Sequence, residues 1–313
     1  MRLLVTGGAG FIGSHLVDKL SSAAVDEVVV LDNLSFGFST NIPENVPLLV
    51  GDVCNKAFVD SVFAEHQFDA VVHLAAQTMV PYSIKHPSED CEINLLGLIN
   101  ILEACKNNNV KTFIFSSSAA VYGNNEDIPL KETAALCPTS FYGITKMTSE
   151  HYIRVYHELY GLNALVFRFA NVYGERQGAG GEGGVVSIFC KLLSANQKLQ
   201  VFGNGEQTRD FIYAGDIAEA IIAGLKNAQG FKVCNVSSAT ELSINGLLNT
   251  FKKAAGRDFE VEYLPPREGD IFRSVLDNTY LCQVLNAKPT MDIQIGITKT
   301  FADYLNHGKE SDQ

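Results

Sequence analysis

Apolar positions along this 313-residue chain follow two alternating patterns, short continuous runs and stripes at helical spacing. The first run, residues 3–5, is followed by Ile12, Leu16 and Leu20, which recur at the spacing of one helix face. Further strands are predicted at 27–31, 47–50, 70–74, 110–115 and 232–236, with helices at 56–66 and from Asn94 onward. Regular alternation of strand and helix predicts an α/β fold with a parallel, doubly wound sheet and right-handed crossovers.

A glycine-rich turn, Thr6-Gly7-Gly8-Ala9-Gly10, joins the first strand to the first helix. Gly7 and Gly10 let the backbone approach a ligand closely, and Gly13 lets the helix lie close on the sheet. Backbone N–H groups and the helix dipole then converge into a cradle for a pyrophosphate. Asp32 ends the second strand, where a carboxylate binds an adenosine ribose and repels a 2′-phosphate. The pattern therefore predicts a Rossmann-like fold that binds NAD rather than NADP.

Two further strand ends carry candidate cofactor contacts. Asp52 is placed to accept a hydrogen bond from the adenine amino group, although the N-cap of the following helix is an equally good interpretation. Ala75 and Ala76 are small enough to let a cofactor pass at the switch point of the sheet. His73 lies inside an apolar strand and is interpreted as a satisfied core histidine rather than a ligand.

Charge and cysteine content narrow the class of protein. The formal charge is −11, with 46% hydrophobic and 19% charged residues, and no basic run is present. Nucleic-acid binding is therefore not expected, and any anionic ligand must be held by a few local cations. Seven scattered cysteines without a C-x-x-C pair suggest reduced packing residues, neither a disulfide framework nor a zinc or other metal site. With no apolar run of membrane length and a strand from residue 2, we expect no signal peptide, no membrane contact and a cytoplasmic protein.

Candidate chemistry follows the fifth strand. Ser116-Ser117-Ser118 ends that strand, and Tyr142 and Lys146 stand four residues apart at the start of the next predicted helix. Residues at this spacing share one helix face, so the ammonium is expected near the phenol. A free phenol has a pKa of about 10, and both Lys146 and a positive nicotinamide ring are expected to favour the phenolate. The pattern predicts a tyrosine base with a serine on its proton path.

The ordered set of motifs resembles the extended short-chain dehydrogenase/reductase family, most closely its NAD-dependent nucleotide-sugar 4-epimerases of the UDP-galactose/UDP-N-acetylglucosamine type. The matching stretches cover nearly the whole chain: TGGAGFIG at 6–13, LDNL at 31–34, GD at 51–52, HLAA at 73–76, Asn94, SSSAAVYG at 116–123, YGITK at 142–146, RFAN at 168–171, RDF at 209–211 and REGD at 267–270.

The resemblance implies roles for individual residues. Ser118 would help bind the sugar 4-hydroxyl, Tyr142 would be its base, and Lys146 would hold the nicotinamide ribose and tune Tyr142. Cofactor contacts are implied for Gly7, Gly10, Phe11, Ile12, Asp32, Asn33, Asp52, Val53, Leu74, Ala75, Ala76, Asn94, Ser116, Tyr142 and Lys146.

Substrate contacts are implied in the second half of the chain. They are Asn171 on the diphosphate, Arg209 and Arg267 as its counter-charges, Asp270 on the uridine ribose, Val185 and Phe202 at the uracil, and Ser274 beside an N-acetyl group. Arginine suits a diphosphate because its guanidinium binds two oxygens at once. In isolation the two arginines would be interpreted as surface salt bridges. The small side chain of Ser274 implies that UDP-N-acetylhexosamines are accepted beside UDP-glucose and UDP-galactose.

The implied reaction oxidises the sugar at C4 to a ketone and reduces it again on the other face. Fold alone does not settle function, because nucleotide-sugar dehydratases and decarboxylases share it. Those enzymes carry acidic residues just after the serine position, where this chain has Ala119 and Ala120. A non-catalytic NAD-binding regulator is a further alternative, which the retention of Ser118, Tyr142 and Lys146 disfavours.

The resemblance also implies a division of the chain. The NAD-binding Rossmann domain would take residues 1–170 and about 232–236, and a smaller α/β substrate-binding lobe would take 171–210 and 240–313. The glycine run 178–184 is either a flap over the sugar or a plain connector. A homodimer is expected through a four-helix bundle of the helices after Asn94 and around Tyr142. Apolar residues suited to that contact, or equally to packing on the sheet, are Leu95, Leu98, Leu102, Ile153 and Tyr156.

Overall fold

A parallel sheet of seven strands forms the centre of the computed structural model, which describes residues 1–21, 27–178, 183–266 and 271–307. Its strand order is β10-β6-β5-β4-β1-β2-β3, so the direction of strand addition reverses between β1 and β4. The predicted doubly wound, Rossmann-like sheet is confirmed. The strands are β1 (Arg2–Thr6), β2 (Glu27–Asp32), β3 (Leu48–Val50), β4 (Ala70–His73), β5 (Thr112–Ser118), β6 (Asn163–Phe169) and β10 (Phe231–Val236).

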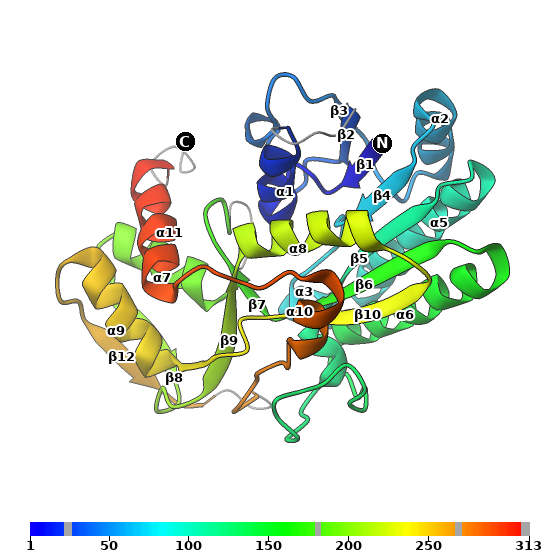
Figure 1. Ribbon diagram of the computed structural model, residues 1–313. Coiled ribbons are helices and arrows are strands. Elements are labelled where there is room, and N and C mark those ends of the chain that lie inside the picture. Colours follow the sequence, from blue (N-terminus) through cyan, green and yellow to red (C-terminus); the bar gives the residue numbers. More distant parts are fainter. Residues whose placement is uncertain (22–26, 179–182, 267–270, 308–313) are drawn as a thin grey trace.

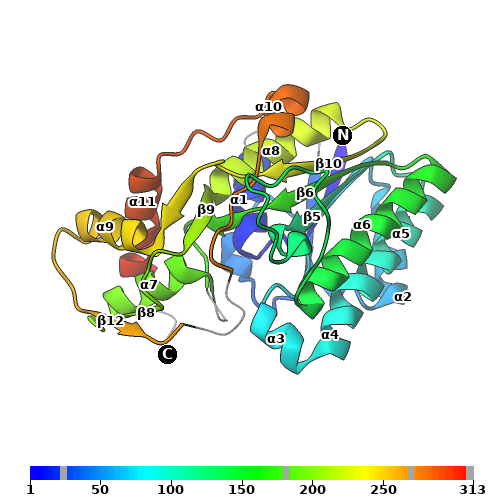
Figure 2. The same cartoon turned by 90° about the horizontal axis from the view of Figure 1, so that it is seen from below.

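Helices cover both faces of this sheet (Figure 2). One face packs against α1 (Phe11–Ser21), α8 (Ala214–Asn227) and α10 (Thr279–Leu285), and the other against α2 (Lys56–His66), α5 (Gly97–Asn107) and α6 (Phe141–Tyr160). Along β1, Leu3 and Val5 enter the first core while Leu4 enters the second. Burial on both faces explains why the strands are continuous apolar runs in the sequence.

A smaller lobe stands beside the sheet, at the left of Figure 1. Its core is built around Phe189, Phe251 and Phe301. Its elements are β7 (Asn171–Tyr173), α7 (Val185–Ser194), β8 (Leu199–Phe202), β9 (Thr208–Tyr213), β11 (Glu241–Ser243), α9 (Ile244–Ala255), β12 (Val261–Leu264) and α11 (Ile293–His307).

One part of the expected division is wrong. Leu281 and Leu285 of α10 are buried in the core that lies between the large sheet and α8. Helix α10 therefore belongs to the first lobe, although it lies within residues 240–313. Its apolar residues are too few to show in the sequence which of the two cores they enter.

The helix expected to open at Asn94 begins earlier, at Pro87. It starts as α4 (Pro87–Cys91), continues through a π-helical segment (Glu92–Leu96) that contains Asn94, and ends as α5. Proline at the first helical position has no N–H to leave unpaired. A short helix, α3 (Val80–Lys85), precedes it, and 3₁₀ turns occur at Ser39–Asn41 and Ala119–Tyr122. π-helical segments often occur at functional sites, and this one therefore makes Asn94 a candidate site residue.

A buried ion pair anchors α6 to the sheet. Glu150 accepts hydrogen bonds from Arg168 at 3.0 Å and 2.6 Å and from the Ser117 hydroxyl at 2.5 Å. Arg168 also donates to the Tyr122 hydroxyl at 2.9 Å, and Tyr122 donates to Asn235 on β10. The network joins β5, β6, β10 and α6 in one rigid frame.

Candidate active site

The glycine turn after β1 is closed against the end of β4. Gly7 has φ +70°, and a Cβ placed on it would lie 2.6 Å from the backbone nitrogen of Ala75. A Cβ on Gly13 would lie 2.1 Å from the carbonyl oxygen of Gly7, so α1 approaches the turn itself rather than the sheet. Gly10, Phe11 and Ile12 follow at the start of α1 and are partly exposed. The turn is therefore tightly packed at the start of α1, where a pyrophosphate cradle is predicted.

Asp32 and Asp52 lie at the carboxyl ends of two neighbouring strands. Asp32 accepts hydrogen bonds from the backbone of Ala9 and Leu34, both at 2.9 Å, which orients its carboxylate beside the glycine turn. Asp52 accepts from the Asn33 side chain at 2.9 Å and the Cys54 backbone at 2.8 Å. Burial opposes the charge of Asp52, but these hydrogen bonds outweigh it and lower its pKa.

The N-cap interpretation of Asp52 is wrong. Asn55 caps α2, since its side chain accepts from the Phe58 backbone N–H at 3.1 Å. The Asp52 carboxylate instead stays at the end of β3, next to Asn33. Val53 is buried against Gly97, where an added Cβ would meet it at 2.8 Å.

The loop after β4 is held from behind by Asn94. The side-chain oxygen of Asn94 accepts from the Gln77 N–H at 2.9 Å, and its amide donates to the Gln77 carbonyl at 3.0 Å. At the other end, Leu74 and Ala75 donate to the backbone and hydroxyl of Thr6. Asn94 is 2% exposed, and Ala75 and Ala76 lie in the loop between its Gln77 contacts and Thr6.

Ser118, Tyr142 and Lys146 meet at the carboxyl end of β5. Ser118 is the last residue of β5 and hydrogen-bonds the Tyr142 phenol. Ser83 accepts a hydrogen bond from the Tyr142 N–H at 3.2 Å, which fixes the first turn of α6. The Lys146 ammonium donates to the Ser116 carbonyl at 2.8 Å and lies 5.9 Å from the centre of the Tyr142 ring. The structure thus brings the three predicted catalytic residues together.

The expected effect of Lys146 on Tyr142 is not observed. Burial raises the pKa of Tyr142 to about 12, and the negative charge of Asp90 adds to this, against a lowering hydrogen bond from Ser118. Burial lowers the pKa of Lys146 to about 8, while Asp90 and Glu150 oppose that change. Lys146 points at the Ser116 carbonyl and packs 4.8 Å from the Phe115 ring centre. The protein alone therefore keeps Tyr142 protonated at neutral pH.

His73 is a core residue, as predicted, but it is not the fully satisfied histidine that was expected. It is fully buried between Phe113 and Phe115, and its Nδ1 atom lies in a hydrogen bond 2.8 Å from the Thr6 hydroxyl. Burial, together with the charge of Lys146, lowers the pKa of His73 to about 3, so the ring is neutral. Its Nε2 atom has no hydrogen-bond partner within the described ranges.

The predicted substrate residues are distributed along the smaller lobe. Asn171 begins β7, which pairs with β9, the strand that carries Arg209. The segment around Ser274 runs beside β9, because Thr208 donates to the Phe272 carbonyl at 2.9 Å. Val185 begins α7 and Phe202 ends β8. The placements of Arg267, Asp270 and residues 179–182 lie outside the described residues.

Several buried polar residues near the site had no signal in the sequence. Asp90, Gln77 and Thr145 form a cluster under the catalytic helix, with Asp90 accepting from Gln77 at 2.7 Å and from Thr145 at 2.8 Å. Asp210 similarly ties β9 to Ser238 and to the Leu276 N–H. None of these residues belongs to a periodic pattern, and their partners are distant in sequence.

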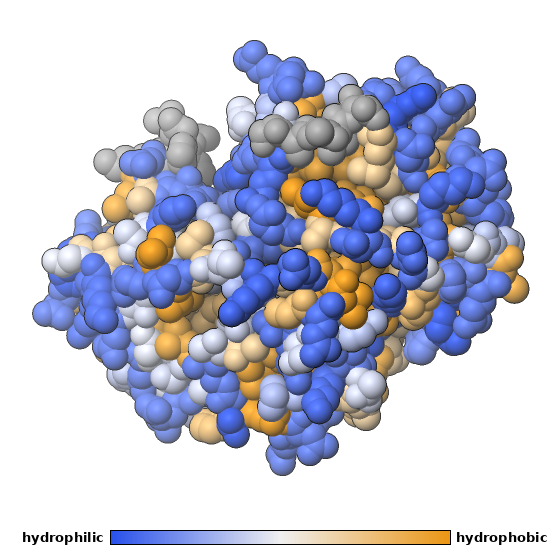
Figure 3. All heavy atoms as spheres, viewed as in Figure 1, coloured by the Kyte–Doolittle hydropathy of each residue, from blue (hydrophilic) through white to orange (hydrophobic). Residues whose placement is uncertain are grey.

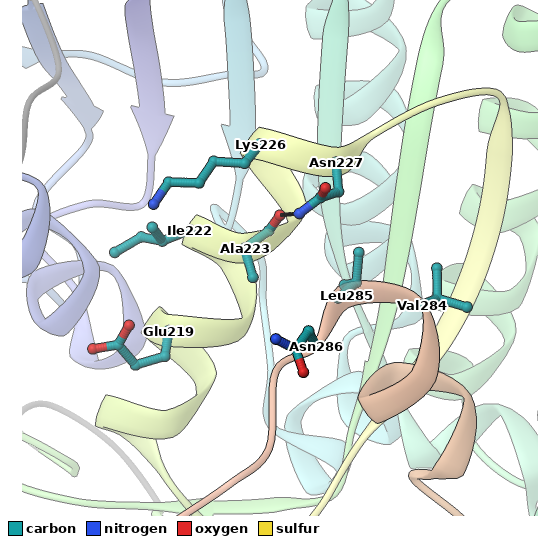
Figure 4. A pocket seen from close by; sticks show the side chains of 8 residues that line it. All are labelled: Glu219, Ile222, Ala223, Lys226, Asn227, Val284, Leu285 and Asn286. Atoms are coloured by element: carbon teal, nitrogen blue, oxygen red, sulfur yellow. Dashed lines mark hydrogen bonds between the residues drawn. The ribbon is translucent and has the colours of Figure 1, made fainter.

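A cavity of about 400 Å³ between α8 and α10 lies apart from this site (Figure 4). Glu219 and Lys226 of α8 and Asn286 after α10 line it, on the sheet face opposite to α6. The molecular surface seen from that side is mainly hydrophilic, with separate hydrophobic patches (Figure 3). Within the described ranges, no helix could cross a membrane and no group of three acidic, histidine or cysteine side chains could hold a metal.

Comparison with known proteins places the chain in a family. Residues 3–237 match the model of the NAD dependent epimerase/dehydratase family. The chain belongs to this family. The matched segment contains the glycine turn, Asp32 and the assembled Ser118, Tyr142 and Lys146.

Individual family members are similar over nearly their whole length. A UDP-glucose 4-epimerase of Mycolicibacterium smegmatis is 36% identical over 312 residues, covering 98% of this chain and 99% of that protein. The crystal structure of the Thermotoga maritima UDP-glucose 4-epimerase with UDP-glucose has a TM-score of 0.94 at 37% identity, covering 98% and 99% of the two chains. A UDP-N-acetylglucosamine 4-epimerase from Methanobrevibacter ruminantium, in complex with UDP-N-acetylmuramic acid, has a TM-score of 0.92 at 35% identity, covering 98% of each chain.

The close approach of Gly7 to Ala75 predicts a specific loss of NAD binding. Gly7→Ala must move the cradle away from the end of β4. We expect NAD affinity to fall at least about tenfold, because a loss of about 1.4 kcal/mol of binding free energy is enough for that. Gly161→Ala is the matched control, because Gly161 has φ +71° but no atom within 4 Å of the position that a Cβ would take. In titration calorimetry with NAD+, the dissociation constant of the control should lie within about twofold of that of the native protein. Equal losses in both variants would contradict the role of the contact.

Proposed function

We propose that this chain is an NAD-dependent 4-epimerase of UDP-hexoses, an isomerase that interconverts UDP-glucose and UDP-galactose. The observation that carries the proposal is the assembly of Ser118, Tyr142 and Lys146 at the end of β5, on the same sheet edge as the glycine cradle. Similarity to UDP-sugar 4-epimerases over nearly the whole chain supports it. A Rossmann-like sheet alone would not distinguish this activity from others.

In the proposed reaction, Tyr142 accepts the proton of the sugar 4-hydroxyl. Ser118 forms hydrogen bonds with both the Tyr142 phenol and the 4-hydroxyl. NAD+, held by the glycine cradle and Asp32, would supply the acceptor and donor of the C4 hydride, and its positive charge would favour the phenolate of Tyr142. Tyr142 then returns the proton to the sugar oxygen once the ketone has presented its other face. Lys146, buried at 2% exposure, keeps a positive charge beside the phenol throughout.

Substrate is proposed to lie across the smaller lobe. Arg209 and Arg267 would neutralise the diphosphate with Asn171, while Asp270, Val185 and Phe202 would hold the uridine. A diphosphate in a chain of charge −11 needs such local cations. We assign residues 1–170, 232–236 and α10 to NAD binding, and residues 171–210 with the remainder of 240–313 to the UDP-sugar.

A dehydratase or a decarboxylase of the same family is a less suitable assignment. Ala119 and Ala120 directly follow Ser118 in a 3₁₀ turn and cannot move a proton. A non-catalytic NAD-binding protein could use Lys146 to hold the cofactor, but it would have no use for Ser118 and Tyr142 assembled beside that lysine. Epimerisation needs no acid beyond Tyr142, which agrees with the residues present.

We also propose a homodimer through α5 and α6, with different contacts from those expected. Leu98, Leu102 and Ile153 are fully buried against the sheet, and Leu95 and Tyr156 are partly buried. The outward side of α6 carries a separate apolar row at helical spacing, beside exposed Leu96. Its members are Phe141, Ile144, Tyr152, Val155 and Leu159. An exposed apolar row of this length on a helix pair is suited to a four-helix bundle with a second copy.

A cytoplasmic location is part of the proposal. All seven cysteines are free thiols, and Cys105, Cys190 and Cys234 are buried in the cores. Burial raises the pKa of each of these three thiols, which keeps them unreactive. Free thiols in this number are typical of a reducing compartment.

Removing the phenolic hydroxyl of Tyr142 tests the proposed base. Tyr142→Phe should lower kcat for UDP-galactose by about 10²–10⁴-fold, because that is the usual contribution of a positioned base. NMR spectroscopy of the UDP-glucose formed measures the rate, and calorimetry should show NAD+ affinity within about threefold of the native value. Tyr160→Phe, at an exposed position of the same helix, is the control and should keep full activity. Substantial activity in Tyr142→Phe would contradict the assignment.

Substrate size should depend on Ser274. The native protein is expected to convert UDP-N-acetylgalactosamine as well as UDP-galactose. Ser274→Tyr fills the space beside β9 and should reduce kcat/KM for the N-acetyl sugar at least about tenfold, while UDP-galactose changes by less than about threefold. Parallel NMR assays give the ratio. A native protein inactive on the N-acetyl sugar, or a variant that loses both activities equally, would overturn this role.

A charge in the apolar row of α6 should separate the subunits. Leu159 is 66% exposed, and Leu159→Asp would place a carboxylate in the proposed contact. Light scattering after size-exclusion chromatography should show a dimer for the native protein and a monomer for this variant. Ile295→Asp on α11, where the side chain is 55% exposed, is the control and should remain dimeric. A native monomer would refute the dimer.

A further inference from the structure

Asp90 is a fully buried carboxylate at the end of α4. It accepts hydrogen bonds from the side chains of Gln77 at 2.7 Å, Asn94 at 3.1 Å and Thr145 at 2.8 Å. Gln77 and Asn94 donate to Asp90 through side-chain N–H groups, and the single proton of the Thr145 hydroxyl can be donated to Asp90 or to the Tyr142 carbonyl. No cation lies within ion-pair distance of Asp90 in the part of the chain that the structure describes. Burying a charge without a partner costs free energy, so a favourable interaction elsewhere must offset the burial of this carboxylate.

Lys146 is a buried positive charge on which the Asp90 carboxylate acts, since it raises the pKa of Lys146. Thr145, which binds Asp90, is the residue before Lys146, and its hydroxyl also lies 3.0 Å from the Tyr142 carbonyl oxygen. Lys146 is buried and donates only to the Ser116 carbonyl among the described residues. Among the described residues, neither charge has an oppositely charged group within ion-pair distance, and Thr145 of α6 connects Asp90 to the turn that carries Lys146.

Other charged groups around this pair are neutralised or exposed. Glu150 on α6 is paired with Arg168 on β6 at 2.6 Å. His73 on β4 is neutral, as described above. On α3 and on and beside α4, Lys85, His86, Glu89 and Glu92 are exposed, and Tyr82 donates to Glu89. Tyr142 and Lys146 are then the titratable groups on which the Asp90 charge acts most strongly.

We propose that the buried carboxylate of Asp90 is the counter-charge of Lys146 and sets the pH range in which Tyr142 and Lys146 work together. Asp90 is a positioning residue in this scheme, because it acts through α6 and need not touch substrate or cofactor. The inference rests on the proposed epimerase for its kinetic consequence, but the electrostatic part concerns the protein alone.

The direction of the effect follows from its sign. A nearby negative charge favours the protonated form of a neighbour, so Asp90 raises the pKa of both Tyr142 and Lys146. Catalysis needs Tyr142 deprotonated and Lys146 protonated. Removing the charge should therefore move both the acidic and the alkaline limb of the pH profile to lower pH.

Asp90→Asn removes the charge with little change of geometry. The retained oxygen still accepts from Gln77 and Asn94, and the new amide donates to the Thr145 hydroxyl, which turns to donate to the Tyr142 carbonyl. Thr145→Val is the complementary variant, since it removes a hydrogen bond but keeps the carboxylate. Glu92→Gln removes an exposed charge two residues along the helix. Asp90→Ser is a second charge-removing variant if Asp90→Asn folds poorly.

The experiment measures kcat for UDP-galactose against pH with the NAD+-loaded proteins. We expect both limbs to move down by about one pH unit in Asp90→Asn, the size expected for one buried charge nearby. Thr145→Val should lower kcat without moving the limbs, and Glu92→Gln should change neither, because solvent screens an exposed charge. A profile of Asp90→Asn that coincides with the native one after scaling would overturn the proposal.

A second readout needs no turnover. Ultraviolet difference titration of each NAD+-loaded protein against its Tyr142→Phe counterpart isolates the ionisation of Tyr142. The tyrosinate signal should appear at lower pH in Asp90→Asn by a similar amount, and an unchanged titration would also overturn the proposal. If the native protein converts no UDP-hexose, the proposed function fails, while this titration still decides the role of Asp90.

Discussion

The burial of the Lys146 ammonium beneath Tyr142 is the constraint on which the site depends. A charge taken out of water is tolerated only where fixed dipoles and opposite charges replace the solvent. Here the Ser116 carbonyl supplies the direct contact, and the Asp90 and Glu150 carboxylates supply negative potential. Glu150 is itself held by Arg168, so the ammonium is tied to a frame that includes β5 and β6. The charge is thus held in place before any ligand arrives, and a preorganised charge needs no rearrangement during the reaction.

The same frame connects the catalytic residues to the cofactor cradle. Asn94 lies in a π-helical segment and binds both the loop after β4 and the Thr145 hydroxyl at 3.3 Å. In that loop, the backbone of Ala75 packs closely against Gly7. The cradle and the catalytic helix are therefore joined through one packed polar cluster. A displacement of either one should change the position of the other. Placement of both on the carboxyl edge of one parallel sheet explains how two distant motifs form a single site.

Much of the fold follows from local patterns in the sequence. Strands buried on both faces appear as uninterrupted apolar runs, and the glycine turn with Asp32 marks the cradle. Tyr142 and Lys146 could be paired because helical spacing places them on one face. Asp90 and Ser83 could not be found, because their partners are distant in sequence and nothing periodic marks them. The raised pKa of Tyr142 in the protein alone could not be predicted, because burial causes it and burial is a property of the folded chain. The exposed row on α6 was missed for the same reason, whereas the start at Pro87 carries a local signal, proline at the first helical position, that the prediction did not use.

The central claim is that hydrogen leaves C4 of the sugar and returns to it within one protein. Incubation of the native protein with UDP-galactose deuterated at C4, in ordinary water, tests this most directly. The account predicts that the UDP-glucose formed keeps the deuterium at C4, as seen by NMR spectroscopy and mass spectrometry. Epimer that has exchanged deuterium for solvent hydrogen would contradict it, and so would a dehydrated or decarboxylated product.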